Sequence, residues 1–266
     1  MNNKKLARIM TIAGSDSGGG AGIQGDIKTI SSLGGYATSA ITAITAQNTL
    51  GVSNILNIPI NLIEDQIKAI LNDIGADAIK IGMLSNEEII NSITNLLSKL
   101  NNKIPIVLDP VMVAKGGHKL LDEGAEKVLI NKLMPLCTII TPNIPEAEVI
   151  TGQTINNVNE LELSGRYIIE MGIDNVLMKG GHLEGNLLTD ILLNKINLKY
   201  FKSKKINTKN SHGTGCTLSS AIACGLGQEL SIEEAVKRAH KYVNKAIQFA
   251  PNIGKGNGPI NHSIRL

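Results

Sequence analysis

The sequence has no tryptophan and few other aromatic residues, with Phe, Trp and Tyr together making up 2% of 266 residues. Proteins that bind single-stranded nucleic acid stack bases on aromatic side chains, so this composition disfavours that class. A charge excess of one sign is lacking as well, because 26 Lys and Arg stand against 23 Asp and Glu, a net charge of +3. Proteins that bind nucleic acid or an anionic membrane surface carry a strong basic excess. We therefore expect neither a nucleic-acid partner nor a membrane partner.

Cysteine is scarce too, with only Cys137, Cys216 and Cys224. Three is an odd number, and a chain of this length buries enough surface to fold without disulfides. This usage is typical of a reducing compartment, so we expect a cytoplasmic protein. No apolar run approaches the roughly 18 residues of a membrane helix, and the first apolar stretch is too short for a secretory signal. Zinc-site patterns such as Cys-x-x-Cys are absent.

Short apolar runs alternate with amphipathic helical patterns along the whole chain. The apolar runs predict buried strands at residues 6–13, 36–45, 78–81, 104–108, 138–141 and 176–178. Helical spacing covers residues 24–33, 61–74 and 85–100, and a last long helix starts at residue 231. Capping-box spacing is found at Asn61 with Glu64, Ser85 with Glu88, and Ser231 with Glu234. Strands that alternate with helices favour parallel pairing, so we predict one domain over residues 1–266, with a three-layer α/β/α fold around a mostly parallel sheet.

Polar residues and glycines gather directly after the predicted strands. Ligands of open parallel sheets bind at the carboxyl ends of the strands, so these clusters predict one shared site. The clusters are Gly14-Ser15-Asp16, Gln47-Asn48, Gly82-Met83, Asp109-Pro110, residues 143–146 and Lys179-Gly180-Gly181.

The most informative segment is residues 210–221, Asn-Ser-His-Gly-Thr-Gly-Cys-Thr-Leu-Ser-Ser-Ala. Gly213 and Gly215 leave the backbone bare before a helix, where successive N–H groups form an anion hole. Cys216 falls in the first turn of that helix, a position that lowers the pKa of a thiol. The segment is not a Walker A motif, since no Gly-Lys-Ser/Thr follows. The alternative is a purely structural glycine-rich turn beside a buried cysteine.

This segment resembles the anion-hole signature of ribokinase-like small-molecule kinases. It is still more similar to the Asn-Thr-His-Gly-Thr-Gly-Cys variant of hydroxymethylpyrimidine/phosphomethylpyrimidine kinases. The resemblance runs almost from end to end, through residues 13–24, 45–49, 80–84, 108–115, 141–148, 179–182 and 256–262. Three departures are visible: Ser211 replaces Thr, Asn257 replaces His, and Gly-Gly-His replaces Ser-Gly-Asp at residues 116–118.

The resemblance implies a ribokinase-like fold and an ATP-dependent phosphotransferase. Its substrates would be 4-amino-5-hydroxymethyl-2-methylpyrimidine and then the monophosphate of this alcohol, which supplies the pyrimidine half of thiamine. Family members are often oligomers, so a homo-oligomer is expected. A pyridoxal or pyridoxine kinase on the same fold remains an alternative, with Gln47 as the discriminating residue. A protein that only sequesters a pyrimidine is a third possibility, which the intact anion-hole segment disfavours.

The resemblance also implies the catalytic residues. The backbone N–H groups of Gly213, Thr214, Gly215 and Cys216 would hold the transferring phosphoryl group. Cys216 stands where the wider superfamily has an aspartate base, so it is expected to activate the substrate hydroxyl. The alternative is a neutral, oriented thiol, with the anion hole supplying most of the rate.

Asp109 and Glu146 are candidate ligands of Mg²⁺, which accepts one or two carboxylates and keeps several waters. Lys179, Asn143 and Glu146 are expected on the nucleotide side, with Lys179 contacting phosphate. An Asp-Pro pair is also a common turn, and Lys179 fits a surface lysine.

Four residues are expected to bind the substrate. The planar amide of Gln47 matches the amino group and adjacent ring nitrogen of an aminopyrimidine. Gly14 lets the backbone approach the ring, and Met83 offers a polarisable wall. Asp26 is expected to accept a hydrogen bond from the substrate amine or hydroxyl. Asp26 as a helix-cap carboxylate and Met83 as a core residue are the structural alternatives.

Overall fold

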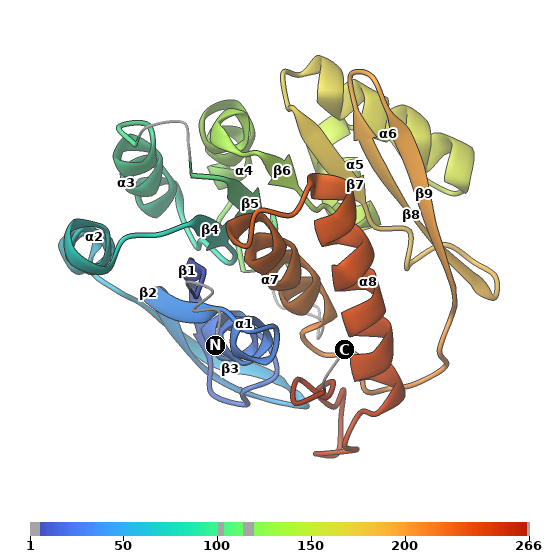
Figure 1. The fold of residues 1–266 in the computed structure, drawn as a ribbon, viewed down its shortest axis with the longest axis horizontal. Coiled ribbons are helices and arrows are strands. Elements are labelled where there is room, and N and C mark those ends of the chain that lie inside the picture. The colour runs from blue at the N-terminus through green and yellow to red at the C-terminus, as the bar shows by residue number, and fades with distance from the viewer. Residues whose placement is uncertain (1–5, 101–103, 114–119, 265–266) are drawn as a thin grey trace, which may run out of the picture.

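A computed structural model describes residues 6–100, 104–113 and 120–264. The departure at residues 116–118 therefore lies outside the described part of the chain. Within that part, a single sheet contains nine strands (Figure 1). They are β1 (Arg8–Asp16), β2 (Tyr36–Asn48), β3 (Gly51–Asn57), β4 (Ala78–Ile81), β5 (Ile106–Leu108), β6 (Ile139–Ile140), β7 (Asn175–Met178), β8 (Leu187–Asn194) and β9 (Leu198–Lys204).

The strand order is β3-β2-β1-β4-β5-β6-β7-β8-β9. The six neighbouring strands in the middle of this order pair in parallel, namely β2, β1, β4, β5, β6 and β7. Strands β3, β8 and β9 pair antiparallel with their neighbours at the two edges. The predicted mostly parallel sheet is thus confirmed. The order reverses between β1 and β4, and ligands of open α/β sheets bind in the crevice beyond such a reversal.

Helices cover both faces of the sheet (Figure 1). The α-helices are α1 (Gly22–Ser32), α2 (Ile60–Ala69), α3 (Glu87–Leu97), α4 (Ala125–Val128), α5 (Ile144–Thr151), α6 (Val158–Glu170), α7 (Thr214–Gly227) and α8 (Ile232–Gln248). Shorter turns of other helix types are η1 (Ile70–Ile74), η2 (Leu129–Leu133) and η3 (Met134–Leu136). No helix in the described ranges is long and apolar enough to cross a membrane.

Two apolar cores, one on each face, give the three predicted layers. Side chains alternate along each strand, so Val107 packs with α1, α7 and α8, whereas Ile106 and Leu108 pack with the helices from α2 to α6. The strands between the cores are almost continuously apolar because both faces are buried.

Helix starts were predicted less well than helices. Ser231 and Glu234 form the expected capping box at α8. The expected box at Asn61 is wrong, because α2 starts at Ile60 after Pro59 and no side chain caps it. The predicted cap at Ser85 is displaced by one residue, since Asn86 accepts the hydrogen bond from the N–H of Ile89.

Candidate active site

A close approach between two strand ends forms the first wall of the site, at the point where the strand order reverses. Gly14 lies at the end of β1, and Met83 follows β4, the neighbouring strand. A side chain at Gly14 would place its Cβ 2.9 Å from Sδ of Met83, so only glycine fits without displacing the methionine. The structure thus brings together two of the residues predicted to bind the substrate.

The glycine loop after β1 wraps around the carboxylate of Asp16. The backbone N–H groups of Gly18, Gly20 and Ala21 donate to it at 2.8, 3.0 and 2.8 Å. Nε2 of His212 lies 2.9 Å from its Oδ2. Burial acts to raise the pKa of Asp16, but the hydrogen bonds from His212 and the loop outweigh it and lower that pKa. Asp16 is therefore a charged carboxylate that ties the loop to the segment before α7.

Gln47, near the end of β2, reaches the same place. Its side-chain nitrogen lies 3.3 Å from Nε2 of His212, and its side-chain oxygen lies 3.2 Å from Oγ1 of Thr45. The Gln47 backbone exchanges hydrogen bonds with the hydroxyl of Ser17. The structure thus brings the predicted substrate amide beside the predicted anion hole.

The anion-hole segment begins α7 as the sequence predicted. Gly213 has a φ of 83°, and a Cβ there would lie 1.8 Å from the carbonyl oxygen of Gly20, so no other residue fits. The first N–H groups of a helix have no partner within the helix and favour an anion. A Cβ at Gly215 would lie 3.3 Å from both Oδ2 of Asp109 and Nζ of Lys179. The start of α7 therefore faces the predicted metal and phosphate residues.

Charged side chains from three elements meet opposite that helix start. Nζ of Lys179 lies 2.8 Å from Oδ1 of Asp109 and 4.0 Å from Oε2 of Glu146. Burial acts to raise the pKa of Asp109, but Lys179 and Lys80 lower it. For Lys179, burial acts in the opposite direction, and the charges of Asp109 and Glu146 raise its pKa to about 12. The pair is therefore ionised at neutral pH.

Glu146 and Asn143 also fix the start of α5. Oδ1 of Asn143 accepts from the N–H of Glu146, and Oε2 of Glu146 accepts from the N–H of Asn143, so the two residues form a capping box. Burial raises the pKa of Glu146 to about 7, helped by the like charge of Asp109. Both residues lie beside Lys179, where the sequence expected the nucleotide.

The carboxylates suit a metal that keeps part of its water shell. In the described ranges, no group of three His, Cys, Asp or Glu side chains is placed to hold a metal ion. Mg²⁺ at phosphate sites is bound by one or two carboxylates together with phosphate oxygens and waters. Lys179 and Thr141 both donate to Oδ1 of Asp109, while Oδ2 lies toward Gly215. This arrangement fits Mg²⁺ with a nucleotide and does not fit a metal held by protein alone.

The expected low pKa of Cys216 is wrong. Burial of the thiol raises its pKa to about 11, although the charge of Lys80 acts to lower it. The first turn of α7 and the nearby lysine therefore do not outweigh the loss of water around the sulfur. In the unliganded protein the thiol is neutral at pH 7, and its role as a base loses its physical support.

Alkylation of Cys216 by iodoacetamide is accordingly expected to be slow at neutral pH. The thiolate fraction would be on the order of 10²-fold smaller than for an ordinary cysteine with a pKa near 8.5. The rate should rise about tenfold per pH unit and level off only near pH 11. Mass spectrometry of the wild type and of Cys216→Ser identifies the labelled thiol. A rate that levels off near pH 7 would restore the thiolate base.

Asp26 does not face a ligand and is wrongly placed as a substrate contact. It is completely buried on α1, and its two oxygens lie 2.9 and 2.8 Å from Nζ of Lys80. The hydroxyls of Thr11 and Ser220 donate to it at 2.5 and 2.6 Å. Asp26 thus joins β1, α1, β4 and α7 beneath the site. Its structural alternative, a helix cap, is not what the structure shows either.

Three residues of the site had no assigned role in the sequence. Asp16 and His212 lay inside the recognised motifs, but their pairing joins positions 196 residues apart and is invisible in the sequence. Lys80 offered a signal, since a charged residue in the otherwise apolar strand Ala78–Ile81 implies a buried partner.

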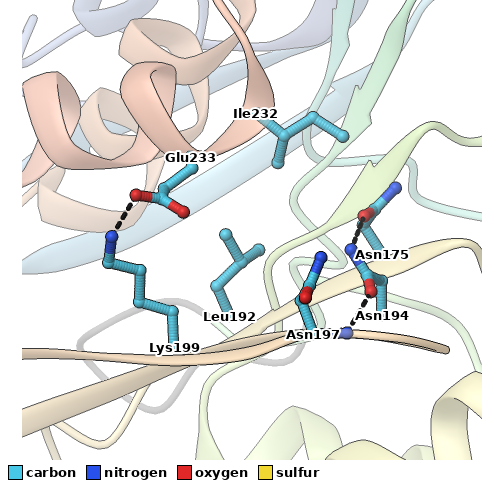
Figure 2. Close-up of a pocket in the computed structure, with 7 residues that line it drawn as sticks. All are labelled: Asn175, Leu192, Asn194, Asn197, Lys199, Ile232 and Glu233. Atoms are coloured by element: carbon cyan, nitrogen blue, oxygen red, sulfur yellow. Dashed lines mark hydrogen bonds and ion pairs between the residues drawn. The ribbon is translucent and has the colours of Figure 1, made fainter.

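A pocket lies away from these residues (Figure 2). It is at the other end of β7 from Lys179 and beside the start of α8, and Lys199 pairs with Glu233 across it. Its lining is Asn175, Leu192, Asn194, Asn197, Lys199, Ile232 and Glu233. It contains none of the predicted site residues.

The fold and the site together define a class. A mostly parallel sheet with helices on both faces and a glycine-rich helix start facing a lysine–carboxylate pair make this chain a ribokinase-like small-molecule kinase. The crystal structure of phosphomethylpyrimidine kinase from Clostridium difficile 630 superposes with a TM-score of 0.81 at 47% identity, covering 91% of this chain and 99% of that one. The ADP complex of Bacillus subtilis pyridoxal kinase superposes with a TM-score of 0.89 at 33% identity, covering 97% and 98%.

Sequence comparison narrows the class to one family. A family model described as phosphomethylpyrimidine kinase matches residues 16–261. The hydroxymethylpyrimidine/phosphomethylpyrimidine kinase of Haemophilus influenzae is 45% identical over 266 residues, 98% of each chain. The thiamine biosynthesis bifunctional protein ThiED of Geobacter sulfurreducens is 47% identical, and the match covers 96% of this chain but 52% of that protein, about half its length. The chain belongs to the phosphomethylpyrimidine kinase family.

Proposed function

We propose that this kinase phosphorylates 4-amino-5-hydroxymethyl-2-methylpyrimidine with ATP and then phosphorylates the monophosphate to the diphosphate. The observation that carries this proposal is the position of Gln47. Its amide, which matches an aminopyrimidine edge, lies beside His212, the residue before the anion hole of α7. When the amino edge of the pyrimidine pairs with Gln47, the hydroxymethyl group beside that edge lies close to the place where a phosphoryl group would bind. The one kinase domain we propose rests on the single sheet that contains all described strands.

The residues opposite α7 divide the work of phosphoryl transfer, which needs positioning and charge neutralisation more than covalent chemistry. The N–H groups of Gly213, Thr214, Gly215 and Cys216 hold the transferring group. Lys179 contacts nucleotide phosphate, on the side where Asn143 also lies. Asp109 and Glu146 would hold Mg²⁺, which would supply charge neutralisation at the phosphates. With Cys216 neutral, the substrate hydroxyl loses its proton late, to an oxygen of the transferring phosphoryl group and not to the thiol.

Pyridoxal is a second candidate substrate, favoured by one observation. The TM-score to the Bacillus subtilis pyridoxal kinase, 0.89, exceeds the 0.81 to the phosphomethylpyrimidine kinase structure. Steady-state rates of ADP release with each alcohol separate the two activities. A kcat/KM that is higher for pyridoxal than for the pyrimidine would overturn the proposal.

Gln47→Ala is expected to weaken binding of the hydroxymethylpyrimidine roughly 5- to 150-fold. The substrate's amino group and ring nitrogen would be buried without partners, at about 1–3 kcal/mol for an unpaired group. Calorimetric titration of the free alcohol measures the affinity directly. Gln248→Ala, which removes the same side chain from the exposed end of α8, is the matched control and should not change it. Unchanged affinity in Gln47→Ala removes this residue from the site.

Two further proposals concern the state of the protein. The three cysteines are all free, which supports the cytoplasm as its location.

We propose that copies of the chain associate through the β2–β3 edge, where Ile44, Leu50 and Leu56 are exposed. Light scattering of the purified protein measures the oligomeric state, and a monomer at micromolar concentration contradicts this.

A further inference from the structure

The amide of Gln47 lies between two side chains that bear no reacting group, His212 and Thr45. The role of these two neighbours, which rests on the proposed function, follows from the hydrogen bonds that each can make. An amide has an oxygen that only accepts and a nitrogen that only donates, so its orientation sets which substrate edge it can pair with. The two ends have nearly the same shape, so their partners decide the orientation.

His212 presents a hydrogen-bond donor to the amide. Oδ2 of Asp16 lies 2.9 Å from Nε2 of His212, and the carboxylate of Asp16 is held charged by the N–H groups around it. A carboxylate only accepts hydrogen bonds. Nε2 must therefore carry a hydrogen whether the imidazole is neutral or protonated. This single hydrogen is directed at Asp16, and Nε2 keeps no lone pair in the ring plane. An amide oxygen, which can share the hydrogen, therefore fits beside Nε2 at 3.3 Å better than an amide N–H₂ does.

Thr45 presents an acceptor to the other end of the same amide. Its hydroxyl has a single hydrogen, which it donates to the carbonyl oxygen of Ser15 at 2.7 Å. Thr45 is only 4% exposed, so its hydroxyl is shielded from solvent and does not donate its hydrogen to water instead. Toward Gln47, 3.2 Å away, it can only accept. The group that best fits beside it is the amide N–H₂.

Both neighbours therefore favour one orientation. In the orientation described above, the amide nitrogen faces the N–H of His212, so two donors meet. In the same orientation the amide oxygen faces the hydroxyl oxygen of Thr45, so two acceptors meet. Turning the amide by 180° about its last bond makes the Thr45 contact a hydrogen bond and lets the oxygen share the Nε2–H of His212 with Asp16, without moving any other atom. After the turn, one N–H and one lone pair of Gln47 remain for a ligand.

We propose that His212 and Thr45 are positioning residues that lock the Gln47 amide with its oxygen on the His212 side and its N–H₂ on the Thr45 side. The lock selects a ring in which an amine donor stands next to a ring-nitrogen acceptor. It also sets the direction of that ring: the amine lies toward His212, and the ring nitrogen lies toward Thr45.

The chemistry of the substrate makes this direction productive. In 4-amino-5-hydroxymethyl-2-methylpyrimidine, the amino carbon lies between the ring nitrogen and the carbon that bears the hydroxymethyl group. An amine on the His212 side therefore sends the hydroxymethyl group farther along the same direction. Gly213, the first residue of the anion hole, directly follows His212. The opposite orientation of the amide would turn the hydroxyl away from the phosphoryl site.

The test compares two rings that demand opposite amide orientations. The 4-oxo analogue of the substrate has a ring N–H donor and a carbonyl acceptor in place of the acceptor and the donor. The wild type is expected to prefer the amino substrate by roughly 30-fold or more in kcat/KM, since two buried pairs are mismatched in the analogue. Thr45→Val removes one half of the lock, and His212→Phe keeps a ring while removing the N–H. Each should lower the amino-to-oxo ratio by about fivefold or more.

Thr45→Ser keeps the hydroxyl and is the matched control, so it should retain the wild-type ratio. A role in structure alone would lower both rates together and leave the ratio unchanged. If Thr45→Val and His212→Phe keep the wild-type ratio, the lock is wrong while the function stands. If the wild type does not phosphorylate the amino substrate, the proposed function fails instead. Should His212→Phe not fold, the Thr45 pair decides alone.

Discussion

Lys80→Met is expected to lower the free energy of unfolding by about 3–5 kcal/mol, because it leaves the carboxylate of Asp26 buried without its counter-charge. Both side chains are completely buried, and their atoms lie 2.8 Å apart. Burial acts to lower the pKa of Lys80, but the charge of Asp26 outweighs it and raises that pKa, so the lysine is charged. Urea unfolding followed by circular dichroism measures the change.

Two further variants make this prediction specific to the buried pair. Lys80→Met combined with Asp26→Asn removes both charges, so most of the lost stability should return. Lys68→Met breaks the exposed pair with Glu64 on α2 and should leave stability nearly unchanged. A Lys80→Met protein as stable as the Lys68→Met protein would show that Asp26 needs no counter-charge.

Asp109→Asn is expected to lower kcat by about 10²-fold or more, with little change in the affinity for the pyrimidine. The amide has nearly the same shape but lacks the charge that pairs with Lys179 and, as we propose, holds Mg²⁺. Losing one preorganised group that stabilises transition-state charge costs on the order of 10²–10³ in kcat. Substrate affinity should survive because we propose that Gln47, Gly14 and Met83, and not Asp109, hold the pyrimidine.

Coupled assays of ADP release give kcat, and calorimetry gives the affinity for the pyrimidine. Asp65→Asn, the same change on the exposed face of α2, is the matched control. Raising Mg²⁺ should recover part of the activity of Asp109→Asn, since a weakened metal site fills at higher concentration. A pyrimidine affinity that falls along with kcat would place Asp109 on the wrong side of the site.

The sheet was predictable because its inner strands carry a local signal. Strands β1, β4 and β7 are mostly apolar and buried on both faces, and glycine or polar residues lie at or just after the end of each. Edge strands lack this signal. Strand β3 was missed because it lies at the edge of the sheet with none of its seven residues buried, so no face of it needs apolar residues. The β8–β9 pair was missed as well, although β8 is largely buried.

The site was predictable in its members more than in their states. Most of the predicted residues come together at the strand ends and the start of α7, namely Gly14, Gln47, Met83, Asp109, Glu146, Lys179 and residues 213–216. The pKa of Cys216 was not predictable, because the sequence shows the helix start and does not show how far the thiol is buried. The predicted substrate contact of Asp26 was wrong for a related reason, since its partner Lys80 is 54 residues away in the sequence and only the fold brings the two together.

Product analysis of one reaction tests the central claim most directly, which is that the residues at the ends of β1, β2 and β4 present a pyrimidine alcohol to the start of α7. The purified protein is incubated with 4-amino-5-hydroxymethyl-2-methylpyrimidine, Mg²⁺ and excess ATP, and the products are separated by mass. The account predicts the monophosphate first and then the diphosphate, with two ADP released per pyrimidine consumed. Pyrimidine recovered unphosphorylated, while the same protein phosphorylates pyridoxal, would contradict it.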